Sequence, residues 1–507
     1  MQETLQQQHT SPASSRALNI PEILIAIGEC FYLSSDGQAT RWAANREKIA
    51  SLIAFIQVSK LWFRTFHPIL WHSYDPFHMC GFSQHSISTN APHFKIIHVF
   101  GELSKQLGCT QLIILELLKS YTYRKILDLP LERQLVSSNP GLRTLVWEGP
   151  QSSTFIDLQK DDFARLGKVR ELVLYRWNNN KLPFIEVLRP MANTLTILEL
   201  RHITHFSVGN LMDSDDLTIT RVTLPRLETI LIDTYRYEYA RRVTPYLIRE
   251  LVVASPNLRT LGLKLHQVED QHGTSELTRC LREYCPNFKE LTIHCVHNNL
   301  DTDPATIGPA ITIIRDCSAS GLTKLTIWDA PWHDNELFLA IISHAGTLVD
   351  LEVSWAVEGY VDLHSVDGAR CVLPLLTQCR QLKKFMITDV PLGELANVFD
   401  VWKKEEWGCK ELETFGIKFA WDGEDDDSAG SDEDEIDAEV EQISGTNPVM
   451  GWYQHDSDTR HVFSGLVKYL FRMLEGKEKI KTLLVDKYQY SRSNIPPVHR
   501  PARVSRQ

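Results

Sequence analysis

The sequence predicts an α/β fold, a curved solenoid with a parallel inner sheet and outer helices, preceded by a small all-α domain. Three observations predict it. A short apolar pattern recurs along most of the 507 residues, helical segments lie between its copies, and two amphipathic segments precede the first copy. A chain of this length usually exceeds one compact core, so several domains or an elongated array of repeats are expected.

The recurring pattern is L-x-x-L-x-L, with other apolar residues allowed at its three anchor positions. It begins at eleven places, which are 142, 169, 195, 227, 258, 288, 322, 348, 382, 412 and 480. From 142 to 412 the copies begin about 30 residues apart on average. The last three residues of each copy alternate as they do in a short strand with one buried face.

The segments between copies carry apolar residues at helical spacing, as at 241–255, 274–285, 335–345 and 371–379. Several end in a turn signal before the next strand, such as NPGL at 139 and CPNF at 285. One strand and one helix cannot bury their apolar faces alone, so the units must stack. The series resembles a horseshoe-shaped leucine-rich-repeat solenoid of the longer-repeat type over residues 135–486.

A helix is predicted at the start of the all-α region, in NIPEILIAIGECF at 19–31. Its proline suits a first helical turn, and Asn19 is a plausible cap. Apolar residues at three- and four-residue steps then line one side of the helix. An isolated helix this short is marginal in water, so we expect something to cover its apolar side.

This helix and the segment LIAFIQVSKLWFRTFHPILW at 52–71 together resemble an F-box spanning residues 18–72. The resemblance to F-box proteins with leucine-rich repeats implies a substrate-recognition subunit of an SCF (cullin–RING) ubiquitin ligase. Such a chain binds a Skp-type adaptor, through it a cullin, and a protein substrate that the sequence does not identify. The adaptor-binding residues that the resemblance implies are Ile20, Pro21, Glu22, Ile23, Leu24, Ile27, Val58, Lys60 and Trp62.

Strand alternation also predicts a target-binding face. The anchors point into the core, so the residue between the last two anchors and the residue just after them point outward. Aromatic side chains among mixed charges suit protein recognition, although solvated strand residues would give the same pattern. The predicted target-binding residues are Tyr175, Arg201, Asp233, Lys264, His266, His294, Trp328, Glu352 and Lys418, whereas Trp147 and Trp355 fall on inward positions.

We expect no catalytic residues, because no nucleotide-binding glycine pattern and no common hydrolase motif occurs. We also expect no cofactor and no metal. The densest group of ligand-type residues, at 280–297, lacks the short cysteine pairs of zinc sites, and its thiols are expected to be reduced and buried. The alternative to the ligase is a protein-binding repeat scaffold in which the N-terminal helices only cap the solenoid.

The formal net charge of −11 is local, because residues 422–441 contain twelve acidic and no basic residues. The remainder is nearly neutral, which disfavours nucleic acid as a partner. No apolar run is long enough for a membrane span and no secretory signal is evident, so an intracellular location, cytoplasmic or nuclear, is expected. The remaining segments are a disordered N-terminus at 1–17, a linker and solenoid entry at 73–134, a disordered acidic insertion at 422–460, and a basic disordered tail at 487–507.

Overall fold

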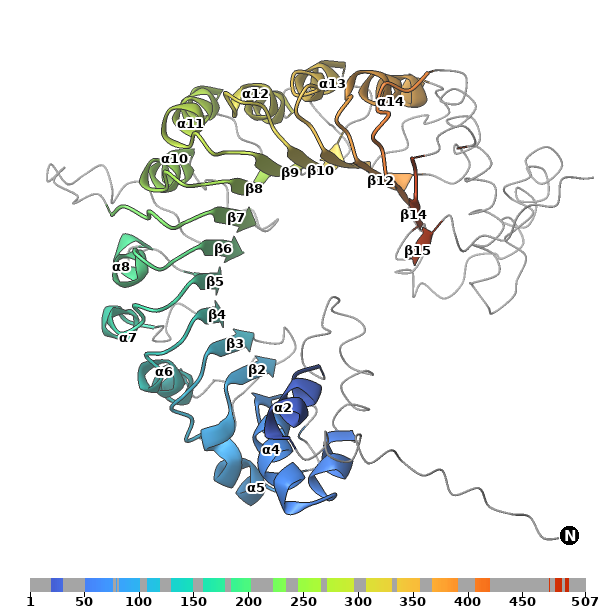
Figure 1. Cartoon of the computed structure of the whole chain (residues 1–507). Helices are drawn as coiled ribbons and strands as arrows, with labels where there is room; N and C mark the ends of the chain where they lie inside the picture. The colour runs from blue at the N-terminus through green and yellow to red at the C-terminus, as the bar shows by residue number, and fades with distance from the viewer. Residues whose placement is uncertain are drawn as a thin grey trace, which may run out of the picture. The chain divides into compact units, whose positions relative to one another are not determined.

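The computed structural model describes residues 20–30, 51–75, 79, 82–100, 107–118, 129–148, 158–177, 184–201, 222–233, 245–265, 271–295, 307–330, 335–355, 367–390, 406–419, 474, 479–485 and 488–491. The chain divides into two compact units, unit 1 (Met1–His205) and unit 2 (Phe206–Gln507). Each unit contains an open run of parallel strands accompanied by helices, which fits an α/β solenoid (Figure 1). The expected N-terminal disorder at 1–17 and the acidic insertion at 422–460 lie outside the described residues.

Unit 1 begins with helices, and the residues that begin and bury one of them, α4, are described. Ser59 caps this helix, since its hydroxyl accepts a hydrogen bond from the backbone N–H of Trp62 over 3.2 Å. One side of α4 buries Phe66 and Leu70, and α2 packs against α4 with Leu24 fully buried. Residues 51–56 are also helical. The labelled helices are α2 (Pro21–Cys30), α4 (Lys60–Leu70) and α5 (Gln84–Asn90).

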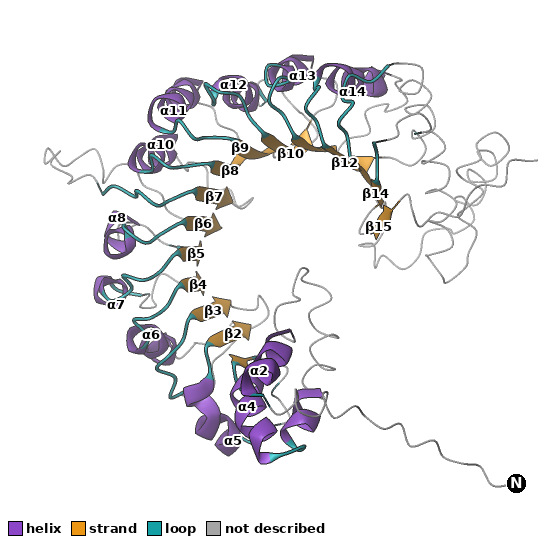
Figure 2. Cartoon of the chain, viewed as in Figure 1, coloured by secondary structure: helices purple, strands orange, loops and turns teal. Residues whose placement is uncertain are grey.

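The strands of unit 1 are parallel, and each pairs with its neighbour in sequence. They are β1 (Ser73–Tyr74), β2 (Ile96–Phe100), β3 (Ile114–Leu118), β4 (Thr144–Glu148), β5 (Glu171–Tyr175) and β6 (Ile197–Arg201). Figure 2 shows helices on one side of β4–β6, which leaves the other side of these strands without a helical layer. The helical segments of this layer and the entry turn are η1 (Ala91–His93), α6 (Leu129–Ser138), α7 (Lys160–Ala164), α8 (Phe184–Leu188) and η2 (Arg189–Met191).

Unit 2 repeats this arrangement with longer helices. Its parallel strands are β7 (Thr229–Asp233), β8 (Thr260–Leu265), β9 (Glu290–Cys295), β10 (Lys324–Ala330), β11 (Asp350–Trp355), β12 (Lys384–Val390), β13 (Thr414–Phe419) and β14 (Thr482–Val485). Its helices are α10 (Pro245–Ala254), α11 (Gln271–Tyr284), α12 (Gly308–Asp316), α13 (Asn335–Ile342) and α14 (Asp367–Gln378). No helix in the described ranges is long and apolar enough to cross a membrane.

The anchors of the repeat pattern form the core of each unit. In β5, Leu172 and Leu174 are fully buried, while Tyr175 stays partly exposed. The parallel register sets equivalent anchors side by side, as Leu172 with Leu198. Trp147 is fully buried, as the alternation predicts. Each anchor therefore packs against its own helix and against the next repeat, which is why one repeat cannot fold alone.

A buried asparagine joins two neighbouring repeats of unit 1. Asn139 follows α6, and its amide nitrogen donates to the carbonyl oxygens of Leu135 at 2.7 Å and Cys109 at 2.9 Å. Its amide oxygen accepts from the N–H of Leu112 at 2.9 Å. Cys109 and Leu112 belong to the preceding repeat, so a single buried side chain satisfies three polar groups between two repeats.

A buried histidine has the equivalent place in unit 2. Nδ1 of His344 accepts from the N–H of Leu322 over 3.2 Å, and Nε2 lies against the carbonyl oxygen of Ile314. These contacts require the neutral imidazole with its proton on Nε2. Burial lowers the pKa of His344, which agrees with a neutral ring.

All eleven copies of the apolar pattern coincide with strands, β4 to β14. The strands begin earlier than expected, because β1, β2 and β3 lie within the segment 73–134 that we expected to be a linker and entry region. The pattern recurs there at 94 and 112, but these copies begin only 18 residues apart. At the other end β15 (Tyr488–Ser491) pairs antiparallel with β14, inside the segment expected to be a disordered tail.

Candidate partner-binding surfaces

Apolar side chains are exposed on the first helices of unit 1. Ile20, Ile23 and Ile25 are 43%, 38% and 44% exposed, and Val58 and Phe63 are 60% and 47% exposed. We call these five residues the N-terminal apolar surface. Only two other large apolar side chains of the described residues, Tyr284 and Leu339, are exposed. Apolar exposure concentrated in this way is typical of a site that another protein covers.

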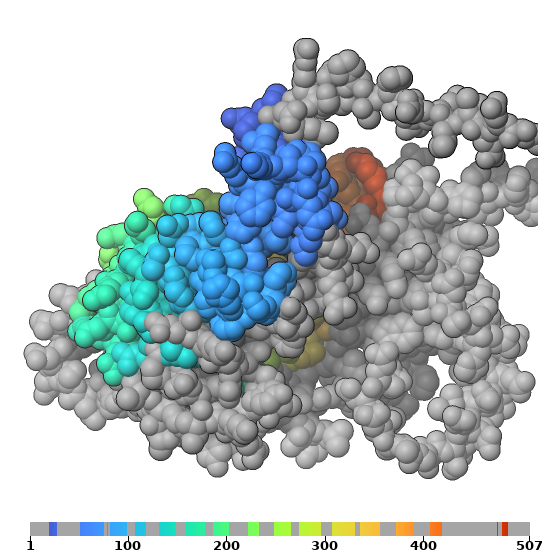
Figure 3. Space-filling view, turned by 90° about the horizontal axis from the view of Figure 1, so that it is seen from below, coloured from blue at the N-terminus to red at the C-terminus, as the bar shows by residue number. Residues whose placement is uncertain are grey.

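Aromatic side chains pack between the helical residues 51–56 and α4, next to this surface. Trp62 meets the ring of Phe55 edge-on at 5.5 Å and that of Phe66 at 5.4 Å. Phe66 is fully buried, so the inner side of α4 is fixed while Phe63 on its outer side remains in water. Atoms of these helices, in blue, are visible on the face of the chain that Figure 3 shows from below.

The structure separates the nine predicted adaptor-binding residues into three groups. Ile20, Pro21, Glu22, Ile23, Val58 and Lys60 are exposed. Ile27 and Trp62 are partly buried, and Trp62 belongs to the aromatic packing. Leu24 needs correction, because it is fully buried where α2 packs on α4 and does not lie on the surface.

Ile25 and Phe63 are exposed apolar residues that the sequence analysis missed. Helical spacing alone groups Leu24 with Ile20 and Ile27, but it does not show which part of that side packs on α4. Phe63 lies three residues after Lys60, so the two share a face of α4. Its spacing from Lys60 could therefore have predicted that Phe63 is exposed.

The predicted target-binding residues are spread along the strands of both units. Tyr175 and Arg201 lie in unit 1, and Lys264, His294, Trp328 and Glu352 lie in unit 2, each partly buried. Asp233 and Lys418 lie on β7 and β13, but their side chains, like that of Trp355, are outside the description. His266 also lies outside the described residues.

In unit 1 the outward side chains form a charged cluster around Tyr175. The guanidinium of Arg201 lies over the Tyr175 ring, 5.2 Å from its centroid, and Arg201 also pairs with Glu199. Arg176 Nη1 lies 3.1 Å from Glu148 Oε1. Burial raises the pKa of the Tyr175 hydroxyl, so this phenol stays protonated near neutral pH.

In unit 2 a similar cluster surrounds Trp328. The register sets Trp328 beside His294, and His294 Nε2 is hydrogen-bonded to Asp329. Asp329 directly follows Trp328, just as Arg176 follows Tyr175. Both residues have left-handed backbone, with φ of 56° and 53°, which is uncommon outside glycine. In both clusters the left-handed residue reaches back to a residue on the preceding strand.

Arg176 and Asp329 were not predicted. Strand alternation assigns a side to each residue only while the backbone stays extended. A left-handed residue at the end of a strand turns its side chain back over the face. Arginine does not mark such a position in a sequence, and aspartate, although enriched there, is also common elsewhere.

The described part of the group of potential ligands at 280–297 contains three buried thiols and the partly buried His294. Cys280, Cys285 and Cys295 are all buried. Burial raises the pKa of Cys285 and of Cys295 to about 12, so both remain protonated thiols at neutral pH. Within the described ranges, no three His, Cys, Asp or Glu side chains lie together as a metal site would require.

The chain was compared with family models, with curated proteins and with solved structures. No family model matches the sequence, and no curated protein matches it. Among solved structures, the chain is similar to one described as the crystal structure of the Rad7 and Elc1 complex in yeast. The match has 12% sequence identity, covers 80% of this chain and 90% of that chain, and has a TM-score of 0.36. Values this low support no statement about the partners of this chain.

Proposed function

We propose that this protein is the substrate-recognition subunit of an SCF (cullin–RING) ubiquitin ligase. In this proposal the N-terminal apolar surface binds a Skp-type adaptor, and outward residues of the strands bind a protein target. The observation that carries the proposal is the exposure of Ile20, Ile23, Ile25, Val58 and Phe63 on one helical region. The resemblance of the same region to an F-box suggests which class of protein the partner belongs to, a Skp-type adaptor.

The energetics favour a partner for this surface. Fully burying an isoleucine or phenylalanine contributes about 1.5–3 kcal/mol, so covering side chains that are roughly half exposed contributes about 1 kcal/mol each. Five such residues offset a substantial part of the entropy lost on association. An amphipathic helix that presents apolar residues to a groove is a common mode of protein recognition.

The chain itself would carry no catalytic residues. Its contribution would be proximity, because a target held on the strands has a high effective concentration near an enzyme carried by other subunits. Tyr175 and Trp328 are the natural anchors of the target, since aromatic side chains contribute strongly at protein interfaces. Each of these two partly buried aromatic residues lies beside a pair of polar side chains, Arg176 with Glu148 and His294 with Asp329, which fits such a role.

The direct test is binding of the full-length chain to a recombinant Skp-type adaptor. Ile23→Asp sets a charge in the N-terminal apolar surface and should weaken binding at least about tenfold, since desolvating an unpaired carboxylate is costly. Leu339→Asp is the matched control, because Leu339 is 57% exposed on α13 in unit 2. Its affinity should equal that of the wild type.

Two outcomes would count against the proposal. If wild-type protein shows no binding to the adaptor, the ligase role fails, and the protein-binding scaffold with a helical cap becomes the better account. If Ile23→Asp and Leu339→Asp bind equally well, the adaptor does not use the N-terminal apolar surface.

A further inference from the structure

The outer face of α4 carries two cations that have no acidic partner among the described residues. Lys60 and Arg64 are both exposed, and Phe63 lies between them on the same face. No Asp or Glu of the described ranges forms an ion pair with either cation. His67, one turn further, has its pKa lowered by burial and by His93, so it adds no charge near neutral pH.

This charge arrangement is unfavourable for α4 itself. Lys60 is the first residue of the helix, where the backbone dipole disfavours a positive charge. The first turn of α4 contains no acidic residue to compensate. Arg64 follows four residues later, and like charges at this spacing repel. The free chain would therefore form α4 more readily without these two cations.

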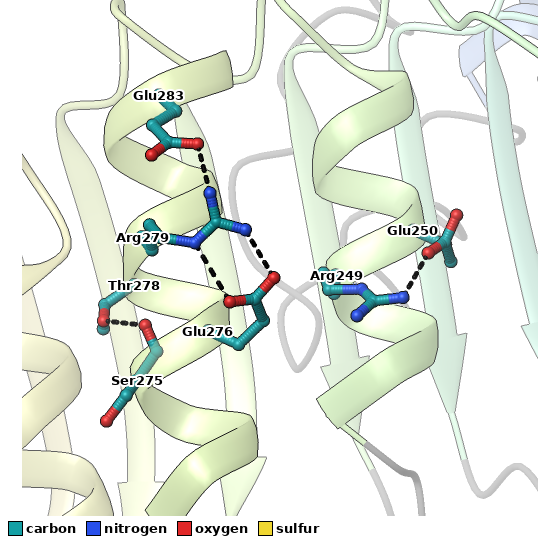
Figure 4. Close-up of polar contacts among 7 residues, drawn as sticks. All are labelled: Arg249, Glu250, Ser275, Glu276, Thr278, Arg279 and Glu283. Atoms are coloured by element: carbon teal, nitrogen blue, oxygen red, sulfur yellow. Dashed lines mark hydrogen bonds and ion pairs between the residues drawn. The ribbon is translucent and has the colours of Figure 1, made fainter.

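Two arginines on helices of unit 2 show a different arrangement. Arg279 on α11 lies between Glu276 and Glu283, with its Nη1 2.6 Å from the Glu283 carboxylate (Figure 4). Arg249 on α10 pairs with Glu250 at 2.8 Å. Arg249 and Arg279 are thus paired within their own helices. Lys60 and Arg64 lack an acidic partner among the described residues and lie beside the exposed Phe63.

We infer that the protein surface receiving α4 is acidic, with carboxylates placed to meet Lys60 and Arg64 on either side of Phe63. This inference rests on the proposed function and specifies the chemistry of the adaptor surface. Phe63 and the isoleucines supply the buried apolar contact. The two cations form its rim, where complementary charge raises the association rate and excludes partners with basic surfaces.

The binding test uses the full-length chain, a recombinant Skp-type adaptor, and the double variant Lys60→Glu/Arg64→Glu. We expect an association rate at least about tenfold lower for the variant at low salt. The wild-type rate should fall as salt rises, and the variant rate should not. Arg282→Glu/Arg380→Glu is the matched control, because it reverses two exposed cations of unit 2 and makes the same change in net charge.

A second measurement concerns the stability of α4 in the free chain. There, replacing Lys60 should be favourable, although the same replacement should weaken binding. Lys60→Glu sets an acidic residue at the start of α4 and an attractive Glu–Arg pair four residues apart. Amide hydrogen exchange in the peptide covering 58–70 should become about twofold slower in the variant. A change that stabilises the helix yet weakens the complex identifies the cations as binding residues.

The outcomes separate this inference from the proposed function. Wild-type binding that is independent of salt and equal to that of the double variant overturns the acidic surface while leaving the ligase role intact. Absence of binding by every form overturns both. Loss of binding together with faster exchange in Lys60→Glu would show that the substitution damages α4, which also overturns the inference.

Discussion

His344 Nε2 lies 2.5 Å from the carbonyl oxygen of Ile314, which belongs to the preceding repeat. Nδ1 of the same ring accepts a hydrogen bond from the Leu322 N–H. A second proton, on Nδ1, would therefore have no acceptor and would point at this N–H donor. Burial lowers the pKa of His344 below its ordinary value of 6.5. The unfolded chain therefore binds this proton more readily, and the stability that His344 contributes is present above pH 6.5 and lost as the pH falls through the lowered value.

The corresponding prediction concerns the stability of unit 2 in acid. Hydrogen exchange in the segment 307–322 should become faster between pH 7 and 5, after correction for the intrinsic pH dependence of exchange. His344→Gln should be less stable at pH 7 but should show a smaller change over the same range. An equal pH dependence in the variant would remove His344 as the cause.

Asn139→Ala should cost unit 1 about 2–3 kcal/mol, because it removes three hydrogen bonds and leaves buried backbone groups of the preceding repeat unsatisfied. Asn257→Ala is a suitable comparison, since Asn257 is exposed and its amide donates one hydrogen bond, to the carbonyl oxygen of Pro225. It should cost less than about 1 kcal/mol. Denaturant titration measures both, and similar losses would contradict the role of Asn139.

Gly408→Ala should destabilise unit 2 by about 3 kcal/mol or more. A Cβ at this position would lie 1.8 Å from the carbonyl oxygen of Thr377, and backbone cannot move aside as a flexible side chain can. Gly346→Ala serves as the control, because nothing lies within 4 Å of its Cβ position. Thermal unfolding should distinguish them clearly, and a tolerated Gly408→Ala would show that the turn before β13 adjusts freely.

Trp328→Ala should reduce recognition of the cellular target without affecting the adaptor. The measurement is quantitative proteomics of ubiquitin-remnant peptides in cells that express wild type, Ile23→Asp or Trp328→Ala. Proteins whose ubiquitination requires Ile23 should lose at least about 80% of the signal in Trp328→Ala, as expected for an aromatic anchor worth 1 kcal/mol or more.

Tyr284→Ala is the control for this experiment, since Tyr284 is an exposed aromatic residue on a helix of unit 2. An unchanged ubiquitination profile in Trp328→Ala would exclude Trp328 as an anchor. Absence of any protein that depends on Ile23 would instead count against the ligase role.

Much of the fold could be predicted because buried strands leave a strict signature. Residues such as Leu172 and Leu174 must both be apolar to pack beneath helices, so their two-residue spacing recurs in every copy. The copies at 94 and 112 have the same spacing but fall out of the 30-residue period, so a search guided by period overlooks them. Strand β15 has a weaker signature, because it has only four residues and its alternation consists of two tyrosines, Tyr488 and Tyr490, and no aliphatic anchors.

The sites were less predictable because they depend on packing that spacing does not encode. Leu24 and Ile25 are adjacent and equally apolar, yet one is buried and the other exposed. Which of them faces water depends on where α4 lies. Arg176 and Asp329 depend on a left-handed backbone conformation that arginine does not favour and that an aspartate alone does not identify. Sequence patterns therefore identify the helices and strands well, but they assign individual side chains to a surface less well.

Within each unit every strand pairs only with its neighbours in the chain. Recombination that removes or duplicates one strand–helix segment would bring together two edges with the same register and matching leucine rows, such as those of β10 and β11. The interior would need little redesign after such an event. Evolution can therefore lengthen or shorten the row of strands in steps of one repeat while keeping the N-terminal helices unchanged.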